Sequence, residues 1–193
     1  MPFDALGEAS DDALLILFAG GDADAARILT QRLTPRVFAH ALRLLGGDRA
    51  EAEDVAQEAM LRLWRVAPHW RQGEARVSTW LYRVAANLCT DRLRKARAVA
   101  LDDVAEPPDD TPGALSEIED RQRAVALNAA LDSLPHRQRQ AVVLRHMEGL
   151  GNPEIAEVMD ISTEAVESLT ARGKRALSAA LFGRREELGF GDD

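Results

Sequence analysis

Residues 152–175 constrain the fold of this chain more than any other segment, because they have the spacing of a helix-turn-helix. Ala156 stands where the first helix has to be small, since the second helix crosses it closely. Asp160 falls at the turn, and Val166 falls where the second helix points back into the core. Ser162 can cap the second helix by accepting a hydrogen bond from its backbone. The segment therefore predicts a unit that presents the start of its second helix to the major groove of DNA.

Helical periodicity covers almost the whole chain and strand alternation is absent, which predicts an all-α fold. Residues 105–113, AEPPDDTPG, cannot continue a helix and predict a linker. We therefore expect two small helical domains, residues 1–97 and 115–185, joined by an acidic flexible linker, residues 98–114, and followed by a tail, residues 186–193. The helices expected outside the helix-turn-helix span residues 22–45, 49–66, 78–97, 115–131 and 135–147, and the last helix extends to about residue 181.

Charge and cysteine content limit the classes of protein. The net charge of −8 by itself disfavours nucleic-acid binding, but the acids gather in residues 99–120 and the bases in residues 76–97. The apolar run at residues 14–19 is too short to span a membrane or to follow the pattern of a secretory signal, so no membrane insertion is expected. The single cysteine, Cys89, excludes an internal disulfide and fits a reducing cytoplasm.

The helix predicted over residues 78–97 carries a polar face opposite its apolar stripe. Steps of four and three residues keep its members on one side. Arginine suits phosphates and asparagine suits base edges, so the face is a candidate DNA surface, although a solvated helix face explains the same pattern. Its members are Arg83, Asn87, Thr90, Arg94 and Arg97.

The loop before this helix combines aromatic and basic residues. Exposed aromatic rings beside arginine are what single-stranded bases stack on, and a flipped base needs small polar groups beside an aromatic wall. The alternative is a core role, which is the usual one for tryptophan in small helical domains. The residues concerned are Trp70, Arg71, Ser78, Thr79 and Trp80, and Trp64 is the tryptophan that best fits the core.

Two further surfaces stand out. Glu51, Asp54 and Glu58 line one side of the helix expected at residues 49–66, with Gln57 and Leu61 adjacent. They form either an ordinary wet face or a docking surface for a basic partner. In the second helix of the helix-turn-helix, Ser162, Thr163, Glu164 and Ser168 occupy the first turns, and Arg172, Lys174 and Arg175 follow as candidate phosphate contacts.

No catalytic constellation is found in the sequence. His40, His69, His136 and His146 are scattered, without a cysteine at metal-ligand spacing, and no glycine-rich phosphate loop is present. We therefore expect neither an enzyme nor a metal or cofactor site, and we expect Cys89 to be a buried small residue.

Three segments resemble bacterial sigma factors. AEDVAQEAMLRLWR, residues 52–65, and STWLYRVAANLCTDRLRK, residues 78–95, are similar to conserved region 2, and LPHRQRQAVVLRHMEGLGNPEIAEVMDISTEAVESL, residues 134–169, is similar to region 4. The short acidic joint leaves no room for a further domain. The chain therefore resembles the two-domain extracytoplasmic-function (ECF) group.

The resemblance implies a promoter-specificity subunit of RNA polymerase, serving alternative and stress-responsive promoters under an anti-sigma factor. Its partners would be core polymerase, through the β′ clamp and the β flap, and promoter DNA. It implies that Asp54, Gln57, Glu58 and Leu61 dock on the β′ clamp helices. It implies that Trp70, Arg71, Ser78, Thr79, Trp80, Arg83, Asn87 and Arg94 serve the minus-ten element, where a base is flipped out. It implies that Ser162, Thr163, Glu164, Ser168, Arg172, Lys174 and Arg175 serve the minus-thirty-five element.

The chain departs from the family pattern in the helix that would read the minus-thirty-five element. Where the family has T-V-K-S-R-L, residues 165–170 are AVESLT, so Glu167 and Leu169 replace two bases. Each lost phosphate contact weakens DNA binding and its salt dependence. Two alternatives stay open: a stand-alone helix-turn-helix regulator of duplex operators, and a sigma-like protein that acts only as a protein-binding decoy.

Overall fold

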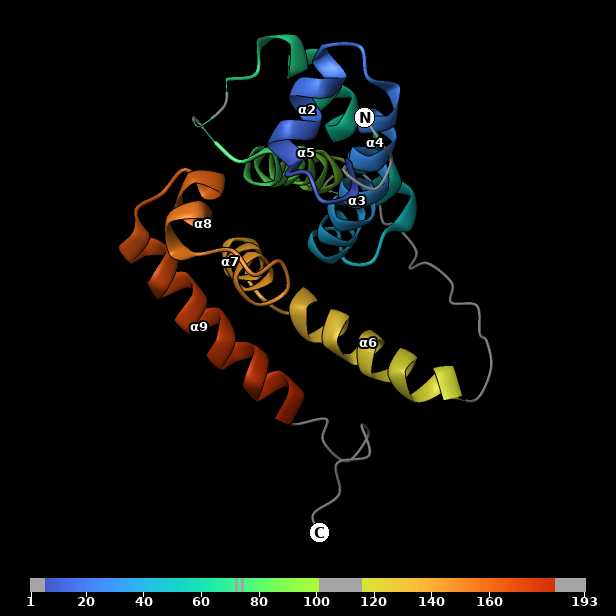
Figure 1. Ribbon diagram of the computed structural model, residues 1–193. Helices are drawn as coiled ribbons and strands as arrows, with labels where there is room; N and C mark the ends of the chain where they lie inside the picture. Colours follow the sequence, from blue (N-terminus) through green and yellow to red (C-terminus); the bar gives the residue numbers. More distant parts are fainter. Residues whose placement is uncertain (1–5, 72, 74, 101–115, 183–193) are drawn as a thin grey trace.

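The computed structural model describes residues 6–71, 73, 75–100 and 116–182, with the side chains of residues 99–100 and 116–123 left aside (Figure 1). Every regular element in these ranges is a helix, which confirms the all-α prediction. The order is α2 (Asp11–Ala19), α3 (Ala23–Leu44), α4 (Arg49–Val66), η1 (Ala67–His69), α5 (Val77–Ala100), α6 (Ser116–Asp132), α7 (His136–His146), α8 (Asn152–Met159) and α9 (Thr163–Phe182).

The predicted linker and tail fall mostly outside the described residues. Residues 101–114 of the linker and the whole tail, residues 186–193, belong to that part. The helix α5 continues to Ala100, three residues beyond the end expected for the first domain. No helix within the described ranges combines the length and the apolarity needed to cross a membrane.

Helices α2 to α5, with η1, form the N-terminal bundle, whose helix ends follow from local sequence. Asp22 Oδ1 accepts from the backbone N–H groups of Asp24 and Ala25, at 2.9 and 3.1 Å, and so caps α3. Asp48 caps α4 in the same way, through the N–H of Glu51 at 3.0 Å. Between them Gly46, at φ +68°, adopts the left-handed conformation that ends a helix cheaply only at glycine. These three features confirm the helix boundaries expected near residues 22, 45 and 49.

The buried stripes expected on α4 and α5 are present. Ala52, Val55, Ala59 and Leu63 are buried on α4, and Val77, Leu81 and Leu88 are buried on α5. Helix α2, which the sequence pattern did not indicate, closes this bundle. Ser10 caps it through the N–H of Ala13 at 3.2 Å, and its buried Leu14 and Leu15 anchor it to the core.

Helices α6 to α9 form the C-terminal bundle, in which α7 packs against α9 and α8 leads into α9. The crossing of α7 and α9 is close at Gly173, which is buried. A Cβ at this position would lie 2.6 Å from Val142 Cγ2 and 3.1 Å from the Gln138 carbonyl oxygen. A residue without a side chain is therefore what lets the two helices meet.

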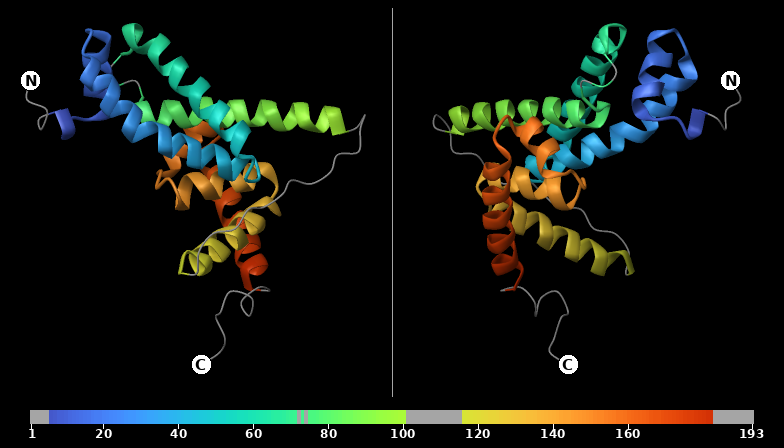
Figure 2. Two further views of the ribbon diagram at one scale, coloured as in Figure 1. Left: turned by 90° about the vertical axis from the view of Figure 1, so that its right-hand side faces the viewer. Right: turned by 60° about the vertical axis from the view of Figure 1, so that its left-hand side comes forward.

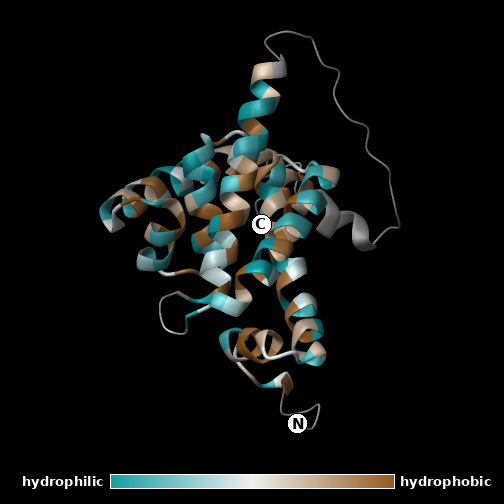
Figure 3. Cartoon of the chain, turned by 90° about the horizontal axis from the view of Figure 1, so that it is seen from above, coloured by the Kyte–Doolittle hydropathy of each residue, from teal (hydrophilic) through white to brown (hydrophobic). Residues whose placement is uncertain are grey.

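The two small helical domains expected from the sequence are present as two bundles, and these bundles are packed against each other. Helix α8 lies against α5, and α7 lies against α3, as Figures 1 and 2 show from several sides. Leu144, Ile155 and Val158 belong to the same buried cluster as the apolar residues of α3 and α5. Figure 3 shows that hydrophobic and hydrophilic residues are interspersed along the helices of both bundles. Helix α8 contacts both α9 and α5, so the apolar residues of the two bundles form one core.

Candidate nucleic-acid and partner interfaces

The acidic face of α4 is open to solvent. Asp54 and Gln57 are exposed, and Leu61, in the next turn, is 49% exposed. Glu58 pairs with Arg62 at 2.7 Å, and this hydrogen bond lowers the pKa of the Glu58 carboxyl. The face therefore presents ionised acids around an accessible apolar side chain, a combination that a basic partner with an apolar contact would fit.

The polar face expected on α5 is also exposed at each of its predicted positions. Two of them have partners within the helix: Arg94 pairs with Asp91 at 2.6 Å, and the Thr90 hydroxyl donates to the Ala86 carbonyl at 2.8 Å. The side chains of Arg83 and Asn87 stand in solvent one turn apart. The face is available for phosphates and base edges along its length.

The three tryptophan side chains pack within the N-terminal bundle and are not fully exposed to solvent. Trp64 packs on Phe18 with ring centroids 4.6 Å apart, as expected for a core residue. Trp70 and Trp80 meet edge to face at 6.1 Å and are both half-buried against the core. The Trp70 indole N–H donates to Asp12 Oδ1 at 3.3 Å, which ties the loop to α2. The core role is therefore confirmed for Trp64 and in part for Trp70 and Trp80, and stacking of DNA bases on these rings stays a prediction.

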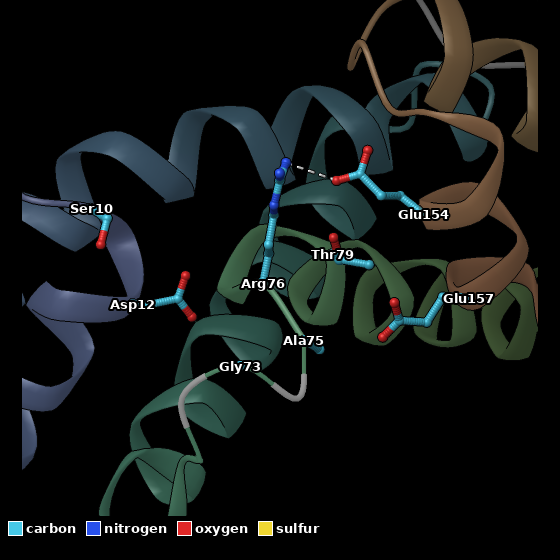
Figure 4. A pocket seen from close by; sticks show the side chains of 8 residues that line it. All are labelled: Ser10, Asp12, Gly73, Ala75, Arg76, Thr79, Glu154 and Glu157. Atoms are coloured by element: carbon cyan, nitrogen blue, oxygen red, sulfur yellow. Dashed lines mark hydrogen bonds and ion pairs between the residues drawn. The ribbon is translucent and has the colours of Figure 1, made fainter.

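A cavity of about 430 Å³ lies between the loop that precedes α5 and helix α8 (Figure 4). Its N-terminal side includes Arg76 and Thr79, and its C-terminal side includes Glu154 and Glu157 of α8. Arg76 Nη1 lies 3.0 Å from Glu154 Oε1, and Thr79 is buried at 2% exposure. Of the predicted minus-ten residues, Thr79 is thus covered here, Ser78 is half-buried and Arg71 is exposed.

The helix-turn-helix has the geometry expected from its spacing. Asp160 ends α8 in the left-handed conformation at φ +52°, and Val166 is fully buried. The Ser162 hydroxyl oxygen accepts from the N–H of Ala165 at 3.3 Å and so caps α9. The backbone N–H of Glu164 and then the Ser162 hydroxyl lower the pKa of the Glu164 carboxyl. The first turn of α9 therefore faces solvent with a negative charge.

The outward residues of α9 are otherwise accessible. Its predicted DNA contacts are half-buried at Thr163 and exposed at Ser162, Glu164, Ser168, Arg172, Lys174 and Arg175. The Arg172 guanidinium donates to the Ser168 carbonyl at 3.3 Å, so this side chain folds back toward the preceding turn of α9.

The two departures from the family pattern on α9 both have structural roles. Glu167 Oε1 accepts from Asn152 Nδ2 at 3.2 Å, so this carboxylate ties α9 to the first turn of α8. Leu169 is half-buried against the shared core. A basic residue would supply neither the acceptor at 167 nor the apolar surface at 169.

A buried polar cluster between the bundles was not expected from the sequence. Glu148, in the turn after α7, keeps only 6% of its side chain exposed. Its Oε2 accepts from the Tyr82 hydroxyl at 2.5 Å, and its Oε1 lies 3.3 Å from Arg43 Nη1 and 3.9 Å from His40 Nδ1. Burial, and then the charge of Arg43, lower the pKa of His40 to about 3, so the imidazole is neutral. Burial and the neighbouring Glu148 raise the pKa of Tyr82. We call these four residues the Glu148 cluster.

The sequence carried a weak signal of this cluster. His40 and Tyr82 are polar residues at positions where α3 and α5 are otherwise apolar. Their common partner lies 66 residues beyond Tyr82, and helical periodicity contains no information on such a pairing.

The fold and these surfaces define a two-part helical protein with a helix-turn-helix in its second part, and comparison with known proteins agrees. The pattern of Sigma-70 region 2 matches residues 29–99, and that of Sigma-70 region 4 matches residues 114–177. The chain is 35% identical to the ECF RNA polymerase sigma factor SigM of Mycobacterium tuberculosis, over 90% of this chain and 86% of that protein. It is 32% identical to the RNA polymerase sigma-H factor of Pseudomonas aeruginosa, over 91% and 96% of the two chains.

Solved structures share the fold. The structure of CnrH in complex with the cytosolic domain of CnrY superposes with a TM-score of 0.65 at 25% identity, covering 91% of this chain and 99% of that one. The chain belongs to the ECF sigma factors of bacterial RNA polymerase, and it is thus a transcription initiation factor. The match to region 2 argues against a stand-alone helix-turn-helix regulator, since that alternative gives no reason for such a region.

Proposed function

We propose that this sigma factor directs core RNA polymerase to its promoters in the cytoplasm through three separate surfaces. The acidic face of α4 docks on the β′ clamp, the loop before α5 with the polar face of α5 holds the minus-ten element, and α9 holds the minus-thirty-five element. The C-terminal bundle also rests on the β flap. The observation that carries the proposal is the exposure of the α4 and α5 faces in the same bundle, beside a well-formed helix-turn-helix.

The charges on α9 attract DNA less strongly than those of the family's usual recognition helix, because two basic residues are replaced. Glu164 and Glu167 stand near the start of the helix, and Arg172, Lys174 and Arg175 lie two to three turns further along. Phosphate contacts therefore come from the later turns, while Ser162 and Ser168 are the uncharged donors available for base edges. We expect a shallow salt dependence for this contact.

An anti-sigma factor is the proposed regulator. The sigma factor RpoE of Bartonella quintana was crystallised in complex with the anti-sigma factor NepR, and its structure covers 79% of this chain at 21% identity with a TM-score of 0.65. The exposed Leu61 and the groove beside Phe38 and Gln57 offer a binding surface on α3 and α4. An anti-sigma factor seated there would exclude the polymerase from the same face.

Run-off transcription with core polymerase and a library of promoter fragments tests the proposal as a whole. We expect transcripts from a subset of fragments that share two sequence elements. Transcripts that never exceed those of core enzyme alone would contradict it, and the decoy alternative would then be preferred.

Docking is tested by Asp54→Ala. Because this carboxylate is exposed on the proposed surface, its loss should weaken binding to core polymerase about tenfold, as for a well-placed interface residue. Asp24→Ala is the matched control, since Asp24 is also an exposed acid but lies in the first turn of α3, where it pairs with Arg27 at 3.3 Å. Equal affinities for the two variants, measured by fluorescence anisotropy, would exclude Asp54 from the interface.

Promoter melting is tested by Asn87→Ala. A single amide that pairs with a base edge contributes about 1–3 kcal/mol, so opening should slow by about fivefold to a hundredfold while the closed complex changes little. Thr90→Ala is the control on the same face, because the Thr90 hydroxyl already donates within its own helix. Permanganate footprinting separates the two steps, and normal opening by Asn87→Ala would remove this residue from the minus-ten site.

A further inference from the structure

The exposed side of α9 changes from acidic to basic along the helix. Steps of three and four residues place Glu164, Glu167, Ser168, Ala171 and Arg172 on one exposed stripe. A helix-turn-helix brings the first turns of its second helix to the base edges of the major groove. Figure 1 shows α8 beside these first turns of α9. Carboxylates therefore stand on the part of α9 that enters the groove.

The two carboxylates of this stripe have different surroundings. Glu164 is turned back onto its own turn, because its own backbone N–H, and then the hydroxyls of Ser162 and Thr163, hydrogen-bond to its carboxylate and lower its pKa. Glu167 comes one turn later, and its Oε1 accepts from Asn152 Nδ2 at 3.2 Å. Its Oε2 has no hydrogen-bond partner among the described residues. Glu167 is thus an exposed carboxylate that is held in one orientation and keeps an acceptor for a ligand.

The base edges of the major groove differ in what they offer a carboxylate. Guanine presents two acceptors, and thymine presents an acceptor and a methyl group, so neither can donate to it. Adenine presents a donor beside an acceptor, whereas cytosine presents its N4 amino group without an acceptor beside it. A single carboxylate oxygen therefore fits cytosine best and repels guanine and thymine, so attraction and exclusion both contribute to specificity.

We infer that Glu167 is a specificity-determining residue of this sigma factor, whose Oε2 accepts a hydrogen bond from the N4 amino group of a cytosine in the minus-thirty-five element. Asn152 is the positioning residue that fixes the carboxylate before DNA arrives, which reduces the cost of ordering this side chain on binding. The inference deepens the proposed function, because it assumes that α9 holds this element.

The departure from the family pattern then has a consequence for promoter choice. Where the family has a lysine, this chain has Glu167. A basic side chain in the groove pairs with guanine, or it holds a phosphate of either strand. A carboxylate does neither, so this chain should select a different base at that position from relatives that keep the basic residue.

The test is transcription by the holoenzyme, formed from the full chain and core polymerase, on duplex promoter fragments randomised over the minus-thirty-five element. Sequencing a barcode in each run-off transcript gives the base preference at every position. We expect the parent to prefer cytosine about tenfold at one position of one strand. Glu167→Gln keeps an acceptor for Asn152 but presents an amide, which pairs with adenine, so cytosine should be replaced by adenine at that position alone.

Two further variants separate base selection from structure and from charge. Asn152→Ala removes the positioning donor but leaves the carboxylate, so the preference for cytosine should fall about threefold without a change to adenine, as expected for one side chain that has to be ordered on binding. Asp24→Asn is the control for the loss of one negative charge, because Asp24 is exposed in the first turn of α3 and pairs with Arg27 at 3.3 Å. It should keep the base preferences of the parent. Circular dichroism verifies that each variant is folded.

A parent without a cytosine preference in this element, or a Glu167→Gln variant with the base preferences of the parent, would overturn the inference. Selection of duplexes from the same library by the free chain gives the base preference without polymerase, since the stripe on α9 is exposed. A free chain that selects cytosine through Glu167, in a holoenzyme preparation that makes no transcripts, would contradict the proposed function alone.

Discussion

At the scale of single residues, the cluster around Glu148 concentrates polar groups in an otherwise apolar interface. His40 is fully buried, and neither ring nitrogen has a hydrogen-bond partner among the described residues. Its ring lies 5.0 Å from that of Tyr82. Burial, and then the charge of Arg43, lower the pKa of this imidazole, so its protonation is unfavourable in the folded chain and stability is sensitive to acid.

The acid sensitivity can be measured. Folding lowers the pKa of His40 from 6.5 to about 3, so between these values the unfolded chain binds a proton that the folded chain does not. Stability is therefore fully present above pH 6.5 and falls with decreasing pH, by up to about 1.4 kcal/mol for each unit until about pH 3. His40→Phe, which cannot be protonated, should flatten this slope.

Urea unfolding at a series of pH values is the measurement. His136 and His146 also have their pKa lowered, chiefly by burial, so the slope should be reduced rather than abolished in the variant. A parent and a His40→Phe variant with the same loss of stability on acidification would show that His40 is protonated without penalty.

The roles of single residues were predictable from the sequence where they depend on near neighbours in the chain, and not where the partner lies on another helix. Val166, Asp160 and Ser162 were predicted correctly, because their roles depend on neighbours within a few residues. Glu167 was interpreted only as a missing base, since its partner Asn152 sits on another helix. Whether the predicted binding residues contact polymerase or DNA stays a prediction.

At the scale of elements, helix boundaries were largely predictable and helix packing was not. The ends of α3, α4 and α7 follow from caps and glycines in the local sequence. Helix α2 was not predicted because its apolar run, residues 14–19, is continuous and lacks the 3.6-residue period of an amphipathic helix. The close crossing of α7 and α9 at Gly173 could not be predicted either, because a single glycine in a helix does not indicate which helix packs against it.

Gly173→Ala tests that crossing. Replacing glycine by alanine in a free helix stabilises it by about 1 kcal/mol. Here the added methyl group meets Val142 Cγ2 at 2.6 Å, and overpacking of this kind costs about 1–3 kcal/mol, so we expect a net loss of stability. Ser178→Ala, at an exposed position of the same helix, should change stability by less than about 0.5 kcal/mol. A stabilised Gly173→Ala, judged by its urea midpoint, would mean that α7 and α9 separate easily.

At the scale of the whole molecule, the continuous core makes the two bundles one cooperative unit. Residues of α7, α8 and α9 share a buried cluster with residues of α2 to α5, and a smaller cluster around Leu131 and Val143 stays within the C-terminal bundle. The order and type of the helices, but not this union, follow from the sequence, because contacts between residues far apart in the chain leave no periodic trace.

Unfolding should therefore be a single transition. The three tryptophans all lie in the N-terminal bundle, so intrinsic fluorescence follows that bundle, whereas far-ultraviolet circular dichroism follows the helices of both. We expect the two signals to have the same urea midpoint in the parent chain, as two-state unfolding requires. In Tyr82→Phe the midpoints should separate. Distinct midpoints in the parent would show that the bundles unfold independently.

The pairing of Arg76 with Glu154 has a consequence for how salt acts on this protein. A free arginine that binds a phosphate displaces small ions from the DNA, and added salt opposes that exchange. In the proposed complex Arg76 would exchange the Glu154 carboxylate for a phosphate, and salt weakens both of these ion pairs. Under the proposed function, the Glu154 carboxylate therefore takes the place of a counter-ion of Arg76, and this arginine should add little to the salt dependence of promoter binding.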